Sequence, residues 1–233
     1  HWLGLLKSVL GYVDTSEYTY GELFNEINAG TGGINCGVEV FDKADSTEEF
    51  HCTFSVRGKA LYPQMSFLFQ MVDEILNTSS LKDTARLYEI IASVKSRAQA
   101  NLIGNGHATA VLRGTSYSSP MAAFQDEMAG VGYYQFIEKL EKEFDSRKGE
   151  TVQELHKLMK QILRPENLMI SYTGERESLE EVKKLTKELK AKLCTEPVEK
   201  SSGRITCVKK NEGFKTSGQV QYVAQTGNFK KKG

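Results

Sequence analysis

Residues 79–113 restrict the fold more than any other part of this 233-residue chain. Apolar residues recur there every three or four positions, at Leu87, Ile91, Val94, Ala98 and Leu102. This spacing predicts an amphipathic helix over residues 81–103, and Ser80, three residues before Asp83, has the capping-box spacing of a helix start. Such a helix is about 35 Å long, so other elements must pack along it.

Gly104-Asn105-Gly106 interrupts this helix, and a second pattern begins at His107. His107 and Arg113 then lie six residues apart on a mostly apolar background, and they are the candidate site residues. One interpretation is functional: the pair faces a binding chamber and holds an anion or a peptide terminus. The other is structural: the pair caps and tethers the break between two helices.

The rest of the chain alternates between the helical and the strand period. Helices are predicted over residues 2–10, 19–27, 65–76, 119–128, 133–144, 152–163 and 177–193, with residues 145–150 as a connector. Strands are predicted over residues 34–41, 50–57, 168–173 and 218–225, the first two as an antiparallel pair. This order predicts an α+β fold in which an antiparallel or mixed sheet is covered on one face by helices.

Composition excludes several kinds of partner. Lys plus Arg (30) balance Asp plus Glu (30), which argues against a nucleic-acid surface built on bulk charge. No apolar run approaches the roughly 20 residues of a membrane-spanning helix. We therefore expect neither nucleic acid nor a membrane as a partner.

The cysteines and histidines give no metal-binding pattern. Cys36, Cys52, Cys194 and Cys207 form no C-x-x-C pair, and the histidines at 1, 51, 107 and 156 are scattered. We therefore expect no metal or cofactor site in this chain. Reduced thiols are the simplest interpretation, and they favour the cytoplasm or an organelle matrix.

Six segments together carry a resemblance to a known family. They are TGGI (31–34), VRGKA (56–60), SRAQANLIGNGHATAVLR (96–113), GVGYYQFIEKLEKEF (130–144), RPENLMISYTG (164–174) and QVQYVAQTGN (219–228). In this order and spacing, the chain resembles the presequence-protease branch of the pitrilysin/insulinase-type zinc metallopeptidases.

The resemblance implies an architecture larger than this chain. In that family four homologous LuxS-like α+β domains form two halves, which close around a chamber that takes unstructured peptides. The first domain binds zinc through an H-x-x-E-H motif and a distal glutamate. By resemblance, residues 1–194 are the third domain without its leading strand, residues 195–213 a linker and residues 214–233 the first strand of the fourth domain. The implied partners are the other domains and, for the parent protein, unstructured peptides.

The catalytic pattern is missing from this chain. No H-x-x-E-H motif occurs, so no catalytic or zinc-binding residue carries over, and zinc belongs to the parent enzyme only. The leading expectation is a non-catalytic domain that walls the chamber and joins the two halves of a zinc-dependent oligopeptidase. A stand-alone inactive peptide-binding or scaffold module is the alternative. A self-contained Ser or Cys hydrolase has no supporting motif such as G-x-S-x-G.

The last predicted strand lacks a partner of its own. Residues 218–225 alternate Val220, Tyr222 and Ala224 with largely polar neighbours, as a half-buried strand does. An unpaired sheet edge invites pairing, so we expect this strand to dock on an exposed edge. The edge could belong to its own chain or, in a strand-swapped dimer, to a second copy.

Overall fold

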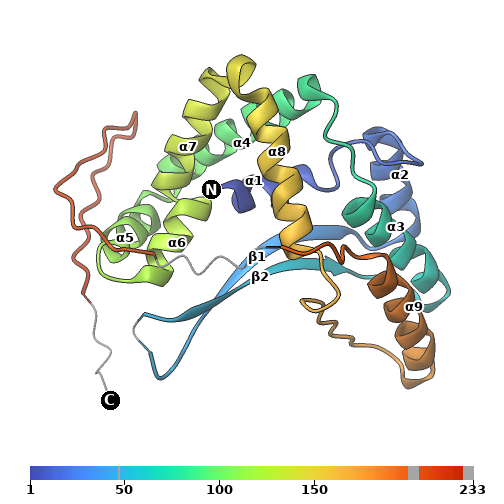
Figure 1. Ribbon diagram of the computed structural model, residues 1–233. Coiled ribbons are helices and arrows are strands. Elements are labelled where there is room, and N and C mark those ends of the chain that lie inside the picture. Colours follow the sequence, from blue (N-terminus) through green and yellow to red (C-terminus); the bar gives the residue numbers. More distant parts are fainter. Residues whose placement is uncertain (47, 199–204, 228–233) are drawn as a thin grey trace.

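The computed structural model describes residues 1–46, 48–198 and 205–227, and these are mostly helical (Figure 1). The elements are, in order, α1 (Trp2–Val9), α2 (Tyr20–Gly30), β1 (Ile34–Asp42), β2 (Phe50–Gly58), α3 (Met65–Asn77), α4 (Thr84–Gly104), α5 (Gly106–Ser116), α6 (Pro120–Ala129), α7 (Val131–Lys142), α8 (Phe144–Ile162) and α9 (Leu179–Lys192). Short 3₁₀ turns at Tyr62–Gln64 and Arg176–Ser178 precede α3 and α9. No described helix is both long enough and apolar enough to cross a membrane.

The helix predicted from residues 79–113 is confirmed as α4, and it runs through the main core. Its apolar face, including Leu87 and Ile91, packs beside α1 and α7 in one cluster with Leu5, Leu6 and Ile137. All five of these side chains are fully buried. Burying one side chain of this kind stabilises the fold by roughly 1.5–3 kcal/mol, so the apolar period of α4 is a major source of stability.

The predicted start of α4 is wrong by three residues. Asp83 caps the helix, since its carboxylate accepts the backbone N–H of Arg86 at 3.0 Å. The Ser80 N–H instead donates to the Asp14 carbonyl at 2.7 Å, which fixes Ser80 in the loop before the helix. The predicted capping box at Thr19 is confirmed, with Glu22 as its reciprocal partner.

The sheet is smaller than predicted. β1 and β2 form an antiparallel hairpin in the register Ile34↔Gly58 to Asp42↔Phe50, and no third strand joins it within the described residues. The hairpin runs below α1 and α8 (Figure 1). The fold is α+β in the broad sense, and the predicted helix-covered sheet is wrong.

Residues 168–173 form no strand. Tyr172 packs instead with Met65 of α3 and Val182 of α9 in a second, small core cluster. Its hydroxyl contacts the Ser178 hydroxyl, next to the start of α9. Tyr172 thus packs against helices, whereas Met169 and Ile170 of the same segment are exposed. The apolar composition that predicted a strand does not correspond to a paired strand here.

The connector predicted at residues 145–150 is also wrong, because α8 begins at Phe144 and continues through it. Arg147 pairs with Glu143 and Glu150, four residues before and three after it. Such pairs support a polar turn of helix. Phe144 and Thr151 are buried on either side of this turn, so the helix stays attached to the core.

Residues 218–225, predicted as a docked strand, have no strand pairing. The chain lies beside α5 instead, at the far end of the molecule from α9 (Figure 1). Docking on its own sheet edge is therefore wrong within the described residues, and the strand-swapped dimer stays a prediction. Part of the predicted linker, residues 199–204, and the end of the predicted final strand, residues 228–233, lie outside the described residues.

Candidate functional site

The candidate site is the surface of α5 that holds residues 205–227, which we call the C-terminal segment. Several side chains of this segment contact α5: Glu212 contacts Arg113, Tyr222 lies against Gly106, and Thr226 lies against Gly114. The segment and α5 are separated in the sequence by most of the second half of the chain. The site is thus a long-range junction between a helix and the chain that follows the domain.

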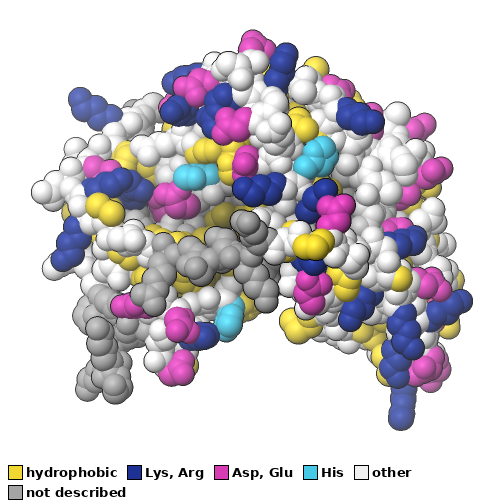
Figure 2. Space-filling model, in the orientation of Figure 1, with side chains coloured by type: hydrophobic (Ala, Val, Ile, Leu, Met, Phe, Trp, Pro, Cys, Tyr) yellow, Lys and Arg dark blue, Asp and Glu magenta, His cyan; other side chains and the backbone are white. Residues whose placement is uncertain are grey.

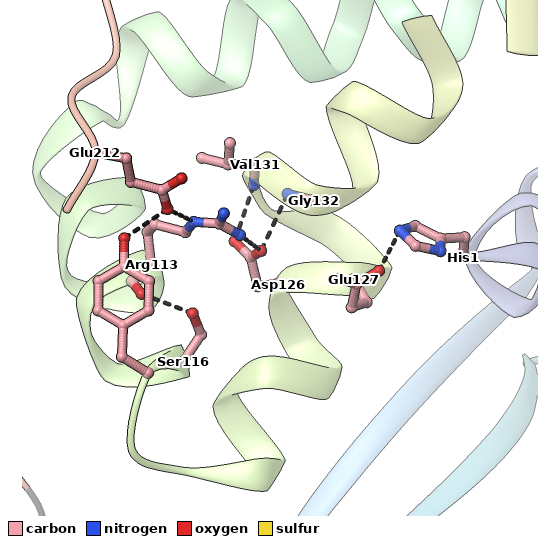
Figure 3. Close-up of polar contacts among 9 residues, drawn as sticks. His1, Arg113, Ser116, Asp126, Glu127, Val131, Gly132 and Glu212 are labelled. Carbon is pink, nitrogen blue, oxygen red and sulfur yellow. Dashed lines mark hydrogen bonds and ion pairs between the residues drawn. The ribbon is translucent and has the colours of Figure 1, made fainter. Parts of the chain in front are cut away.

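Arg113 is the centre of this junction (Figure 3). Its Nε donates to Glu212 Oε1 at 2.6 Å, and its Nη1 donates to Asp126 Oδ2 at 2.5 Å. The Arg113 side chain is only 12% exposed, and that of Asp126 is 2% exposed. One guanidinium therefore ties α5 to α6 and to the C-terminal segment through charge-assisted hydrogen bonds, which are stronger than neutral ones.

Asp126 makes a second connection, to the start of α7. Its carboxylate accepts the backbone N–H groups of Val131 and Gly132, both at 3.0 Å (Figure 3). A helix N-terminus has unpaired N–H groups and a partial positive charge, so a carboxylate is favoured there. A side chain at Gly130 would place its Cβ 2.4 Å from Asp126 Oδ1, so the glycine allows the close approach.

Glu212 is held from two sides. Besides Arg113, the Tyr117 hydroxyl donates to Glu212 Oε1 at 2.6 Å. The Arg113 guanidinium carbon also lies 5.7 Å from the ring centroid of Phe214, within cation–π range. These contacts define where the C-terminal segment crosses α5.

The charges at this junction alter one another's pKa values. The hydrogen bond from Arg113 is the main reason that the pKa of Glu212 is lowered. Burial alone would lower the pKa of Arg113, but hydrogen bonding to Glu212 and the charge of Asp126 raise it overall. Burial, followed by the bond to Glu212, raises the pKa of Tyr117. The lowered pKa of Glu212 and the raised pKa of Arg113 keep this pair charged at neutral pH, which suits a structural junction.

Two glycines of α5 bring the C-terminal segment close to the helix. A Cβ at Gly106 would lie 2.6 Å from the Tyr222 ring, and one at Gly114 would lie 3.1 Å from Thr226. Positions 106 and 114 are two turns apart and share one helix face. The helix surface is therefore shaped for this segment, with Arg113 beside the second glycine.

The two predicted site residues both meet the C-terminal segment, at different places. His107 is exposed, and its ring centroid lies 6.0 Å from that of Tyr222. Arg113 is hydrogen-bonded to Glu212 of the C-terminal segment. Asp126 and Glu212 were missed by the sequence analysis. One sequence signal could have pointed to Asp126. It is an acidic residue shortly before Gly130-Val131-Gly132, where a helix begins, and a carboxylate is favoured near a helix N-terminus.

The described residues hold no cluster of three or more His, Cys, Asp or Glu side chains arranged for a metal ion. His1 contacts Glu127 (Figure 3) and stacks on Phe136 at 4.6 Å between centroids, so it joins α1 to α6 and α7. His51 and His156 are exposed. These residues do not fit the three-ligand zinc site of the parent family. Figure 2 shows acidic and basic side chains interspersed over one face, in keeping with the balanced composition.

Comparison with known proteins identifies the family. A family model described as Peptidase M16 (subfamily C) associated matches residues 1–140. The chain is 35% identical over 232 residues to Protein HypA of Clostridium perfringens and covers 24% of that protein. It is 28% identical to the mitochondrial presequence protease of Yarrowia lipolytica over 139 residues, 60% of this chain and 14% of that protein. With presequence protease 1 of Arabidopsis thaliana it is 24% identical over 219 residues, 92% of this chain and 20% of that protein.

The chain belongs to this peptidase-associated family, and its relatives include presequence proteases. It spans about a quarter or less of the length of each of these relatives. The sequence-based resemblance to the presequence-protease branch is confirmed. The matched region corresponds to one part of a longer, multidomain protein.

The glycine surface of α5 can be tested with a matched pair of substitutions. Gly106→Ala should loosen the C-terminal segment, because the new Cβ meets the Tyr222 ring, whereas Gly104→Ala meets nothing within 4 Å. We expect trypsin to cleave at Lys209, Lys210 and Lys215 about fivefold faster in Gly106→Ala, since losing about 1 kcal/mol of docking energy raises the open population by that factor. Equal cleavage rates in the two variants would contradict the proposed contact.

The ion pair predicts a pH dependence. Because the folded-state pKa of Glu212 is lowered, its ionised form stabilises docking above the ordinary glutamate pKa of about 4.3, and this is lost as pH falls through the lowered value. As the pH falls, the NMR methyl signals of Val208 and Val220 should therefore move toward their positions in the Glu212→Gln variant. The midpoint of this change should lie below about pH 4.3. Signals of Ile91 report unfolding of the core and serve as the control. A midpoint at or above the ordinary value would contradict the assignment.

Proposed function

We propose that the chain is a non-catalytic domain of a zinc-dependent oligopeptidase that degrades unstructured peptides. In this role it forms part of the wall of the substrate chamber and connects the two halves of the enzyme. The C-terminal segment is the connection, and the Arg113 junction fixes where it leaves the domain. The parent protein's zinc, substrates and catalytic residues lie in other domains.

The observation that carries the proposal is the anchored C-terminal segment. A connection that transmits the position of one domain to the next must be fixed at a defined point. Glu212 is held by Arg113 and Tyr117, and Arg113 is in turn held by the buried carboxylate of Asp126. Family membership supports the same role, because the relatives carry this region within much longer chains.

The stand-alone scaffold module remains the competing proposal. In that case the C-terminal segment would cover α5 without leading to another catalytic half. The two proposals differ in what the same reading frame encodes upstream of His1. The oligopeptidase proposal requires an H-x-x-E-H motif there, and the scaffold proposal does not.

The isolated chain should be inactive and free of tightly bound zinc. We expect a molar ratio of zinc to protein far below one after dialysis against a metal-free buffer. We also expect no cleavage of a fluorogenic unstructured peptide. The reason is that the described residues offer no set of three metal ligands. Elemental analysis and the cleavage assay measure both quantities.

Stoichiometric zinc, or cleavage that a chelator abolishes, would overturn the assignment as a non-catalytic domain. A mock preparation, purified in the same way from cells that do not express the chain, serves as a control for contaminating peptidase. Any trace cleavage that is equal in the two preparations comes from a contaminant.

A further inference from the structure

Arg113 offers more hydrogen-bond donors than its partners use. A guanidinium has five N–H groups. Within the described residues, Nε donates to Glu212 and Nη1 donates to Asp126, whereas Nη2 makes no hydrogen bond. Glu212 in turn uses only Oε1, which also accepts the Tyr117 hydroxyl, and its Oε2 makes no hydrogen bond with the described chain. One donor side of the guanidinium and one carboxylate oxygen are therefore not used in this contact.

This contact is not the strongest that an arginine can make with a carboxylate. The strongest contacts are bidentate, with two parallel N–H groups donating to the two oxygens. Glu212 bonds Arg113 through one oxygen, at 2.6 Å. A side chain is restricted by its own backbone, whereas a free carboxylate can turn and present both oxygens. Glu212 therefore occupies this site incompletely.

The donors are held in place without the help of Glu212. Asp126 is 2% exposed and pairs with Arg113, and its own carboxylate is fixed by the N–H groups at the start of α7. The Ser116 hydroxyl donates to the Arg113 carbonyl at 2.7 Å. Glu212 is the more exposed of the two acidic partners, at 22%. Removing it would uncover a guanidinium that is already oriented, and such preorganisation favours binding.

The local charge selects the kind of anion. Arg113 contributes one positive charge, and Asp126 already contributes one negative charge. Glu127 also lies close enough to interact electrostatically with Arg113. A second negative charge on a ligand would meet these carboxylates, so a monoanion is favoured over a dianion such as sulfate. The Tyr117 ring, whose centroid is 5.9 Å from the guanidinium carbon, offers apolar surface to a short aliphatic tail.

We propose that Arg113 and Tyr117 form a binding site for a small aliphatic monocarboxylate, which Glu212 occupies within its own chain. The two oxygens of the ligand accept the Nε and Nη2 donors of Arg113, and one of them also accepts the Tyr117 hydroxyl. Because the ligand and Glu212 need the same donors, binding releases Glu212 and loosens the C-terminal segment. The proposal goes beyond the role as a connecting domain and does not depend on it.

The probe is acetate, added to the complete chain with Glu212→Ala, a substitution that empties the site. Binding is followed by NMR through the Nε–H signal of Arg113. We expect a saturable shift with half-saturation in the millimolar range, since so small a ligand makes few contacts. The Nε–H signal of Arg86, which donates to the Tyr12 carbonyl at 3.0 Å, should not move and shows that the chain is folded.

The native chain and Glu212→Gln complete a graded comparison. Tyr222 and Thr226 keep Glu212 beside the site, so the native chain should need roughly tenfold more acetate, or higher. Its methyl signals of Val208 and Val220 should shift over the same range of acetate, since the segment is released. Glu212→Gln keeps an oxygen that accepts the same hydrogen bonds without the charge, so its acetate affinity should lie between the other two. Because the native chain is titrated as well, the test does not depend on the folding of Glu212→Ala.

The chemistry of the site is tested by one further substitution and two other anions. Tyr117→Phe, added to Glu212→Ala, removes a donor and should weaken acetate binding by roughly threefold to tenfold. Sulfate should bind more weakly than acetate, and chloride at the same ionic strength should give no saturable shift.

Three results would overturn the proposal. The first is an Arg113 signal that does not saturate with acetate, or that responds equally to chloride, because the effect would then be one of salt in general. The second is tighter binding of sulfate than of acetate. The third is an equal acetate affinity of the native chain and Glu212→Ala, because Glu212 would then not occupy the site.

Discussion

The buried carboxylate of Asp126 is the contact on which the helical half of the molecule depends. It accepts two N–H groups at the start of α7 and pairs with Arg113 of α5, while its own backbone belongs to α6. A carboxylate that is almost fully buried is tolerated only when its charge and its lone pairs are satisfied. The three helices therefore have one mutual geometry that keeps this group satisfied, and the C-terminal segment is attached to the same point through Glu212.

Local sequence signals predicted the elements of the fold well. The apolar period of residues 87–102 predicted α4, the capping box at Thr19 predicted α2, and the alternation of residues 50–57 predicted β2, the second strand of the hairpin. Each of these signals depends on contacts within or next to its own element. The arrangement of the elements was predicted less well, because a helix-covered sheet requires strands that pair across the chain.

The two missing strands show why. Residues 168–173 and 218–225 have strand-like composition, but neither segment pairs with a strand. In each, one tyrosine contacts a helix, Tyr172 beside α3 and α9 and Tyr222 against Gly106, while Met169 and Val223 are exposed. The same limit applies to the site. Arg113 stands out in an apolar stretch, whereas its partner Glu212 is 99 residues away and carries no local signal.

The C-terminal segment on α5 is the main long-range feature of the molecule. Its path is fixed by the charged junction of Arg113 with Glu212 and Asp126. The connecting role that we propose for the chain rests on this junction.

The central claim is that Arg113 couples the C-terminal segment to the α5–α6–α7 helices, and a double-mutant cycle between Arg113 and Glu212 tests it most directly. Arg113→Ala, Glu212→Ala and the double variant are compared by the free energy of opening of residues 205–227, obtained from amide exchange. The account predicts a coupling energy of about 1 kcal/mol or more between the two side chains. Effects that add to within about 0.3 kcal/mol would show that the two residues act independently, and would contradict it.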